Sequence, residues 1–371
     1  MNIPFYDAVR EYKLYKAEFD RAIFDAINSG TFILGKEVGE FEEAFCDYTG
    51  AKYAIGVANG SDALVIASDI LGFKKAEVLT PAFTFFASAS CISRVDGIPV
   101  FCDVDEDTFC MNIKDAENRI TNKTRGILPV HLFLQCADMA ACMELAQKHN
   151  LAVLEDAAEA FGMKTMYKGE YKHAGLIGDC GIFSFYPTKT LGGYGDGGMI
   201  VTNNEDLFQK AKKYRVHGAA KKYHHDYVGY NSRLDTLQAA ILSVKLSHID
   251  NAIKKRAHHA AHYREMLKDI AQVKLPVIKD GNMEINYVFC IQAENRDALE
   301  DYLKTKGIGT SVYYPVPMHL QKCFEYLGYK KGDFPVSEKL CGTALALPMF
   351  PELTDDEVSF VCESVKEFYR K

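Results

Sequence analysis

The chain has 371 residues, of which 48% are hydrophobic and 25% are charged, and its formal net charge is −7. That length allows one large hydrophobic core and a smaller second domain, and the mildly acidic balance argues against a general affinity for nucleic acid or anionic membranes. The N-terminal segment lacks the apolar run of a secretory signal, and no stretch approaches the roughly 20 apolar residues of a membrane span, so we expect a cytoplasmic protein.

The 11 cysteines are scattered along the chain and never form a C-x-x-C pair. Most of them lie within apolar stretches, as Cys91, Cys102, Cys180 and Cys290 do. We interpret them as buried thiols of a protein in a reducing compartment.

Between about residues 50 and 215, short apolar runs alternate with helical patterns. The expected strands are 76–81, 98–104, 124–133, 151–157, 181–187 and 197–203, and the helical stretches begin near Ser61, Thr84, Asp138 and Asn204. This alternation is typical of an α/β domain with a mostly parallel, buried sheet.

A stretch without Pro or Gly runs from Leu234 to about Leu267 and predicts a long helix that links two domains. The chain beyond it predicts a smaller α+β domain, with strand-like segments 286–292 and 310–317 and helix-like segments 296–306 and 355–369. We therefore expect an N-terminal arm and large domain at 1–245, and a small C-terminal domain at 246–371.

The segment 181–203 carries the strongest chemical signal. An apolar strand runs to Phe185, Pro187 ends it, and Lys189 follows on a turn. Ligands bind at the C-terminal ends of strands in open α/β sheets, and a desolvated lysine there can lose its proton and form a Schiff base with a carbonyl. An ordinary solvated loop lysine is the alternative.

Glycines 193, 195 and 198 in the same segment form a G-x-G-x-x-G pattern. A dinucleotide-binding turn should open a helix, whereas the strand-like sequence MIVT follows here. A dinucleotide site is therefore not expected.

Two other segments could complete a site around Lys189. Asp156 ends a buried apolar strand, and a buried carboxylate needs a partner such as a protonated ring nitrogen, although it could instead cap a helix. Gly60 and Ser61 open a helix whose free N–H groups could bind a phosphate, unless Ser61 serves only as its N-cap.

A Pro-led turn just past a strand carries three aromatic residues. They are Phe83, Phe85 and Phe86. One of these rings could stack on a planar ligand, although core packing is the usual role of any single phenylalanine.

Two histidine pairs are further candidates. His258 and His262 are four residues apart on the predicted long helix, but the sequence places no third ligand beside them, so we expect no metal. His224 and His225 follow two lysines and a tyrosine, in a loop that is either a solvated face or a contact for a substrate phosphate.

Together these segments resemble the nucleotide-sugar aminotransferases of the DegT/StrS type, which use pyridoxal 5'-phosphate (PLP). The blocks that carry the resemblance are ILGKEVGEFEEAF, NGSDAL, PAFTF, PVFCDVDEDTF, PVHLF, VLEDAAEAFG, FSFYPTKTLGGYGDGG, YNSRLDTLQAAIL, YYPVPMHLQ and ALPMFPEL. The resemblance implies the fold-type I α/β architecture, with a mostly parallel seven-stranded sheet in the large domain and a small C-terminal α+β domain. It also implies a homodimer with shared active sites.

The resemblance assigns roles to individual residues. It implies that Lys189 is the Schiff-base lysine and proton shuttle, and that Asp156 pairs with the pyridine nitrogen of PLP. The other implied cofactor contacts are Gly60, Ser61 and Ser184 at the phosphate, Phe85 on the ring, Glu159 near the ring hydroxyl, where relatives often have Gln or His, and Asn231 from the neighbouring subunit. The implied substrate contacts are Arg233, His224, His225, Tyr313, Tyr314 and His319.

The implied reaction moves an amino group from L-glutamate, by way of PLP, to the keto group of a nucleotide-linked sugar, in polysaccharide biosynthesis. The sequence from Lys221 to Leu242 is most similar to relatives that aminate carbon 3, with carbon 4 as the competitor. Relatives that act as sugar dehydratases have histidine in place of Lys189, so transamination is favoured. A non-catalytic regulator is a further alternative, against which the Lys189–Asp156 pair argues. No nucleic-acid or membrane partner is expected.

Overall fold

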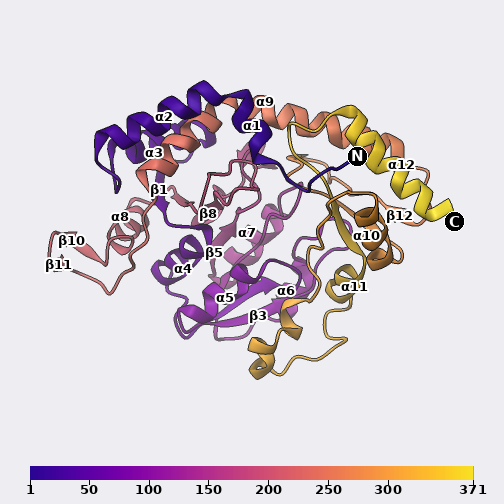
Figure 1. The fold of residues 1–371 in the computed structure, drawn as a ribbon. Coiled ribbons are helices and arrows are strands. Elements are labelled where there is room, and N and C mark those ends of the chain that lie inside the picture. The colour runs from indigo at the N-terminus through magenta and orange to yellow at the C-terminus, as the bar shows by residue number, and fades with distance from the viewer. Residues whose placement is uncertain (371) are drawn as a thin grey trace.

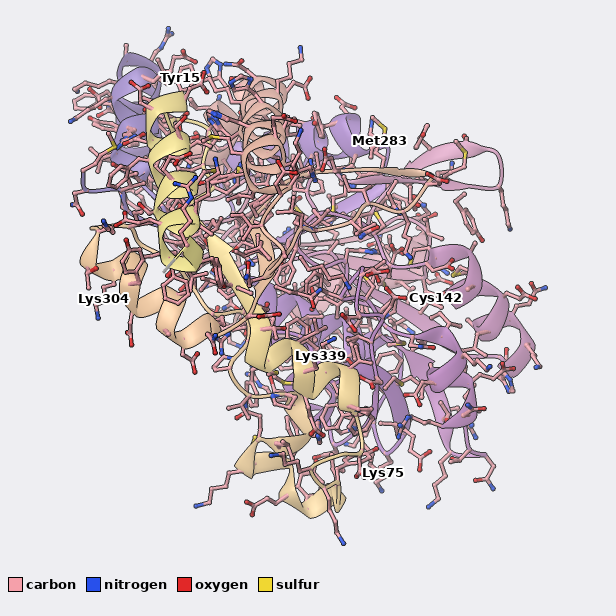
Figure 2. The ribbon with its side chains drawn as sticks, turned by 90° about the vertical axis from the view of Figure 1, so that its right-hand side faces the viewer. Tyr15, Lys75, Cys142, Met283, Lys304 and Lys339 are labelled. Carbon is pink, nitrogen blue, oxygen red and sulfur yellow. The ribbon has the colours of Figure 1, made fainter. Side chains whose placement is uncertain are left out.

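The computed structural model describes residues 1–370. Figure 1 shows a central sheet flanked by helices, with helices α1 to α3 and the long α9 running together across one end of the molecule. The C-terminal part, in orange and yellow, packs along one side, and both chain ends lie there. Figure 2 shows the same division from the side, with Lys304 in the C-terminal part and Cys142 on the opposite side of the molecule.

Within the described residues, the largest sheet has seven strands, and five of them form a continuous parallel row. β9 is antiparallel to both of its neighbours. In spatial order the strands are β1 (Tyr53–Val57), β9 (Gly198–Thr202), β8 (Cys180–Ser184), β5 (Ala152–Asp156), β4 (Thr124–Ile127), β2 (Glu77–Pro81) and β3 (Ile98–Cys102). The mostly parallel seven-stranded sheet implied by the resemblance is therefore confirmed.

The strands of this sheet are nearly continuous apolar runs because helices cover both faces, as is usual for parallel sheets. All six expected strands are present, but two end at least three residues before the expected bound. Segment 124–133 stops at Ile127, just before Pro129, which has no N–H to offer a ladder. Segment 181–187 stops at Ser184, and β1 was not predicted.

Four helices of the large body begin close to the expected positions. They are α4 (Gly60–Ile70), α5 (Phe86–Arg94), α7 (Met139–His149) and α8 (Glu205–Tyr214), whereas α3 (Lys36–Thr49) and α6 (Ile113–Asn118) were not predicted. Asp138 and Asn204 cap α7 and α8 through their side chains. The N-cap of α4 is Asn59, which accepts a hydrogen bond from the N–H of Asp62, so Ser61 is not the cap.

The predicted long helix is α9 (Thr236–Leu267), which spans 32 residues. Its first half packs against α2 (Lys16–Ser29) and α3, which lie beside it in Figure 1, and Lys245 forms an ion pair with Glu11 of α1 (Ala8–Leu14). Its second half packs on the C-terminal body. The expected domain boundary between residues 245 and 246 lies inside α9 and stays a prediction.

The C-terminal body has its own core between a small antiparallel sheet and helices. Its elements are β12 (Val273–Lys274), β14 (Phe289–Ala293), β15 (Ala344–Leu347), α10 (Arg296–Thr305), α11 (Pro335–Thr343) and α12 (Asp355–Arg370), with 3₁₀ helices at Met318–Leu320 and Lys322–Leu327. The strand expected at 310–317 is wrong, because within it only Ser311 pairs, opposite Ala346. This segment instead leads Tyr313 and Tyr314 toward the large sheet.

Two hairpins lie outside these cores. The first consists of β6 (Lys164–Tyr167) and β7 (Glu170–His173), extended by β13 (Asn282–Met283), and the second of β10 (Ala219–Lys221) and β11 (His224–His225). The second hairpin projects from the body at the left of Figure 1.

All 11 cysteines are free thiols, and nine of them are buried, as expected. Across residues 1–370, none of the helices combines the length and the apolar character that crossing a bilayer requires.

Candidate active site

The C-terminal ends of β5 and β8 border a cavity of about 450 Å³. Because these strands are parallel, with Asp156 opposite Ile182, their last residues meet at one edge of the sheet. Nine of the predicted site residues line this cavity: Gly60, Ser61, Phe85, Asp156, Glu159, Ser184, Lys189, Tyr313 and Tyr314. The sheet therefore brings together residues that are up to 254 positions apart in the chain.

Lys189 reaches the cavity from a turn that follows β8. Its backbone N–H donates to the carbonyl of Tyr186 at 2.8 Å, which closes the turn around Pro187. Its Nζ lies 3.1 Å from Oε1 of Glu159 and 4.5 Å from the ring centre of Tyr287. The ammonium is therefore held by a carboxylate and an aromatic face, rather than solvated as in the alternative interpretation.

The surroundings of Lys189 set its protonation. Burial is the largest single influence on Lys189 and would by itself lower its pKa, but the charges and hydrogen bonds of Glu159 and Tyr287 together outweigh burial, and the pKa is raised above its ordinary value. Glu159 is fixed in turn, because its Oε2 accepts a hydrogen bond from the N–H of Phe133 at 3.2 Å.

Replacing Glu159 by glutamine should lower the pKa of Lys189, because burial then acts without the opposing charge. The neutral amine, which attacks aldehydes, would be more abundant at any pH near neutrality. We expect a small aldehyde probe to react with Lys189 in the PLP-free Glu159→Gln chain at lower pH than in the unaltered chain. Mass spectrometry of the reduced adduct across a pH series measures this shift; coincident pH curves would contradict it.

Asp156 is the second ionisable group of the cavity and is 4% exposed. Its Oδ2 accepts a 2.7 Å hydrogen bond from the hydroxyl of Ser88, and its Oδ1 accepts one from the N–H of Ala158. Residues 157–163 form turns, so Asp156 does not cap a helix. Burial raises the pKa of Asp156, and the Ser88 hydrogen bond opposes that rise in part. The carboxyl is therefore positioned to share a proton with a basic ring.

Ser88 was not predicted to belong to the site. Thr84 lies one helical turn before it, and the two hydroxyl oxygens are 3.0 Å apart. Both residues lie in PAFTFFASAS, and the local sequence does not show that Ser88 reaches Asp156, 68 positions away. The other unpredicted lining residues include Tyr186, Thr188, Asp196 and Tyr287.

Replacing Ser88 by alanine should raise the pKa of Asp156 further, because the hydrogen bond that favours the carboxylate is lost. A hydrogen bond to a charged group contributes about 1.5 kcal/mol, so we expect turnover to fall roughly tenfold. The acidic limb of the kcat–pH profile should move to higher pH. Steady-state kinetics across pH measures both effects. The control is Ser90→Ala, which removes a hydroxyl two positions further along α5.

The N-terminus of α4 faces the cavity through Gly60 and Ser61. A helix start carries unpaired N–H groups and a partial positive charge, which together bind anions. A Cβ atom at position 60 would lie 2.8 Å from the Cβ of Ser184, so glycine allows the helix to start directly against the end of β8. Gly60, Ser61 and Ser184 can therefore surround a phosphate group.

Aromatic side chains form another wall of the cavity. Phe85 is 57% exposed, and its ring centre lies 6.2 Å from that of Tyr314. The hydroxyl of Tyr314 donates to Oε1 of Glu159 at 3.4 Å. Phe83, by contrast, is buried in the core, and Phe86 is exposed but does not line this cavity, so only Phe85 of the three reaches it.

Four predicted residues lie away from this cavity on the segment before α9. His224 and His225 are exposed on the projecting hairpin, and Asn231 is exposed at its bridge to Val216. Arg233 follows on the same segment and is partly buried. The single chain does not bring these residues to its own cavity.

His319 also lies outside this cavity. It is 2% exposed, and its Nε2 lies 3.0 Å from Oε1 of Glu338. Its ring packs against Phe334. These contacts hold the C-terminal segment together, and the assignment of His319 to the substrate stays a prediction.

Comparison with known proteins relates this arrangement to one family. The model of the DegT/DnrJ/EryC1/StrS aminotransferase family matches residues 13–366. Over its whole length the chain is 46% identical to a pleiotropic regulatory protein of Geobacillus stearothermophilus, 99% of which is covered. Over 98% of the chain it is 38% identical to the UDP-N-acetyl-3-dehydro-alpha-D-glucosamine 3-aminotransferase of Acidithiobacillus ferrooxidans, 97% of which is covered.

Among solved structures, the fold is similar to that of S. venezuelae DesV in complex with a ketimine intermediate. The TM-score is 0.96 at 36% sequence identity, and the match covers 100% of this chain and 99% of DesV. The likeness therefore includes the C-terminal body as well as the large sheet.

Proposed function

This chain belongs to the DegT/DnrJ/EryC1/StrS aminotransferase family, and from that membership we propose that it transfers the amino group of L-glutamate to carbon 3 of a nucleotide-linked keto sugar. The enzyme is a PLP-dependent nucleotide-sugar aminotransferase. The observation that carries the proposal is one cavity that holds the Lys189 amine, the buried Asp156 carboxyl and the start of α4.

The donor set of the cavity fits PLP. An aldehyde needs an amine, a pyridine nitrogen needs a buried acid, and a phosphate needs unpaired N–H groups, and the cavity supplies all three. We assign Lys189 to the aldehyde, Asp156 to the ring nitrogen, and Gly60, Ser61 and Ser184 to the phosphate. Bound PLP supplies an electron sink, which stabilises the charge left when a C–H bond next to nitrogen is broken.

The residues of the chain then control protons. Asp156 keeps the proton on the ring nitrogen, with its own carboxylate fixed by Ser88. Lys189, once its amine is free, moves a proton through Nζ, and Oε1 of Glu159 at 3.1 Å orients that nitrogen. Tyr313, Tyr314 and Phe85 limit water around these groups from one side.

Carbon 3 is the finer part of the proposal. The Acidithiobacillus relative is named for amination at position 3, and it is similar to this chain over nearly the full length of both. The test incubates the holoenzyme and L-glutamate with 3-keto and 4-keto nucleotide sugars, and locates the new amine by NMR. A 3-amino product supports the proposal, whereas amination of the 4-keto sugars alone would contradict it.

A regulatory protein is the second candidate, because the Geobacillus relative is named a pleiotropic regulatory protein. The Lys189–Glu159 and Asp156–Ser88 contacts favour catalysis, since a protein that only binds needs no positioned proton carriers. Adding L-glutamate to the yellow holoenzyme should bleach its visible absorbance. A chain that binds PLP and never bleaches with any amino donor would favour the regulatory candidate.

We also propose that the enzyme is a homodimer in which Asn231 serves the neighbouring subunit. Asn231 is exposed away from its own cavity, near the projecting hairpin. Large apolar side chains are exposed on the segment after α2, at Phe32 (54%), Ile33 (44%) and Leu34 (39%), and such a patch is typical of an interface.

Replacing Asn231 by alanine should therefore weaken PLP binding, although the residues that line the cavity of the same chain are unchanged. We expect a loss of about tenfold in PLP affinity, as for one charge-assisted hydrogen bond. Mixing inactive Lys189→Ala chains with Asn231→Ala chains should restore part of the activity, because one hybrid site has both residues intact. No recovery in a mixture that exchanges subunits would place Asn231 outside the shared site.

A further inference from the structure

We propose that His258, His259, His262 and Asp355 form a binding site for a divalent transition-metal ion of the zinc type, where the second half of α9 meets the start of α12. The two helices lie side by side at the upper right of Figure 1, away from the β5–β8 edge of the sheet. This proposal does not depend on the amino-transfer reaction.

The sequence showed only the pair His258 and His262, and the structure supplies the missing acid. Asp355, the first residue of α12, is 97 positions beyond His258. Its Oδ1 lies 2.8 Å from Nε2 of His258 and 3.8 Å from Nδ1 of His262. One carboxylate oxygen is therefore within 4 Å of an imidazole nitrogen of each histidine, and histidines four residues apart on one helix face can share a zinc ion.

His259 provides an independent observation. One of its ring nitrogens is within 4.8 Å of the ligand atoms of both His258 and Asp355. The side chain is 4% exposed, and its Nδ1 is buried without a hydrogen-bond partner among the described residues. Its Nε2 lies 3.4 Å from the carbonyl oxygen of Pro351, which fixes the proton on Nε2 and leaves a lone pair on Nδ1. A buried nitrogen without a hydrogen-bond partner, on a residue of this cluster, is a group that a metal ion would satisfy.

The outer contacts of the cluster are those of a metal site. Metal-binding histidines usually donate their second N–H to an oxygen, which fixes the tautomer and orients the ring. The Nε2 of His259 lies beside the carbonyl oxygen of Pro351. In the same way, the Nε2 of His262 lies 3.3 Å from the hydroxyl of Ser359. Two of the three imidazoles therefore have Nε2 beside an oxygen, which leaves Nδ1 as the nitrogen available to a metal.

The ligand types select the class of ion. His258, His259 and Asp355 each bring one ligand atom within 4.8 Å of the others, and Nδ1 of His262 lies 3.8 Å from Asp355. Imidazole and carboxylate ligands match Zn²⁺, and not Ca²⁺ or Mg²⁺, which take oxygen. The side chains of His258 and Asp355 are 62% and 61% exposed, so the ion can enter from solvent. Two nearby cations are engaged elsewhere: Lys255 lies 3.7 Å from Glu352, and Arg256 donates to the carbonyl of Met349.

A bound ion would tie the C-terminal helix α12 to α9. Binding to the folded chain alone raises the stability of the fold in proportion to the logarithm of metal concentration. The site therefore predicts a zinc-dependent rise in Tm that involves no residue of the catalytic cavity.

The test uses full-length holoenzyme without an affinity tag, because a polyhistidine tag binds the same ions. The protein is treated with a chelator, freed of unbound PLP and desalted, and Zn²⁺ is then titrated by calorimetry while Tm is recorded with and without the ion. We expect one Zn²⁺ per chain and a rise in Tm. His258→Ala and Asp355→Asn should each weaken binding at least about tenfold and remove the rise in Tm.

The matched control is Asp356→Asn, which removes a neighbouring exposed carboxylate and should bind Zn²⁺ like the unaltered chain. Because His258 and Asp355 are both exposed, their variants should fold, and the Tm of the metal-free protein checks this directly. His262→Gln provides a third variant, with an expected loss of affinity of the same order. Absence of saturable binding, or equal affinity in the Asp355→Asn and unaltered chains, would overturn the site.

Discussion

Replacing Lys189 by alanine should lower the rate of amino transfer by at least about 10⁴-fold, because one change removes both the covalent partner of the cofactor and the proton carrier. The loss should lie in kcat rather than in sugar binding, since Nζ contacts Glu159 and Tyr287 inside the cavity. Stopped-flow measurement of the glutamate half-reaction gives the rate of amino transfer directly. Calorimetry gives the affinity for the nucleotide sugar.

Lys189→Arg is the matched control for the alanine variant. Arginine keeps the positive charge opposite Glu159 but cannot react as an amine, because it stays protonated. It should be as inactive as alanine while holding the loop more nearly in place. Small primary amines added to Lys189→Ala should restore part of the rate, and an alanine variant that keeps full turnover would refute the assignment of this lysine.

Replacing Asp156 by asparagine should lower kcat by roughly 10²–10⁴-fold while PLP remains bound. Asparagine keeps the size of the side chain and can still accept a hydrogen bond from Ser88, but it carries no charge to hold a proton on the ring nitrogen. Without that proton the cofactor is a poorer electron sink. The measurement is single-turnover kinetics, together with PLP content from absorbance.

Asp179→Asn is a suitable control for this effect. Asp179 is also bonded to the large sheet, because its Oδ2 accepts a hydrogen bond from the N–H of Val153 in β5. It does not line the catalytic cavity. Its loss should reduce stability with little change in the rate of the folded enzyme. If Asp156→Asn retained the full rate at saturating PLP, the ring-nitrogen assignment would fail.

Much of the fold could be predicted because it follows from local patterns. The apolar runs that became β2, β5, β8 and β9 are buried on both faces, and the caps Asp138 and Asn204 mark where α7 and α8 begin. Segment 310–317 was mistaken for a strand because its aromatic and β-branched residues match strand composition. Tertiary contacts with the cavity hold Tyr313 and Tyr314 there instead.

The catalytic cavity was predicted in outline, because Asp156 ends one strand and Lys189 follows another. Ligands of open α/β sheets bind at the C-terminal ends of strands. Their surroundings depend on contacts that sequence cannot show. Glu159 and Tyr287 together oppose the effect of burial on the Lys189 pKa, and Ser88 reaches Asp156 across 68 positions. Asp355 beside His258 is a further case, since only the packing of α12 on α9 brings them together.

The most direct test of the account is to find where the cofactor attaches. The holoenzyme is reduced with borohydride, which makes the link between PLP and its lysine permanent, then digested and analysed by mass spectrometry. The account predicts the phosphopyridoxyl group on Lys189 alone, with none after reduction in the presence of excess L-glutamate. A modified lysine elsewhere, or a cofactor that is never covalently held, would contradict it.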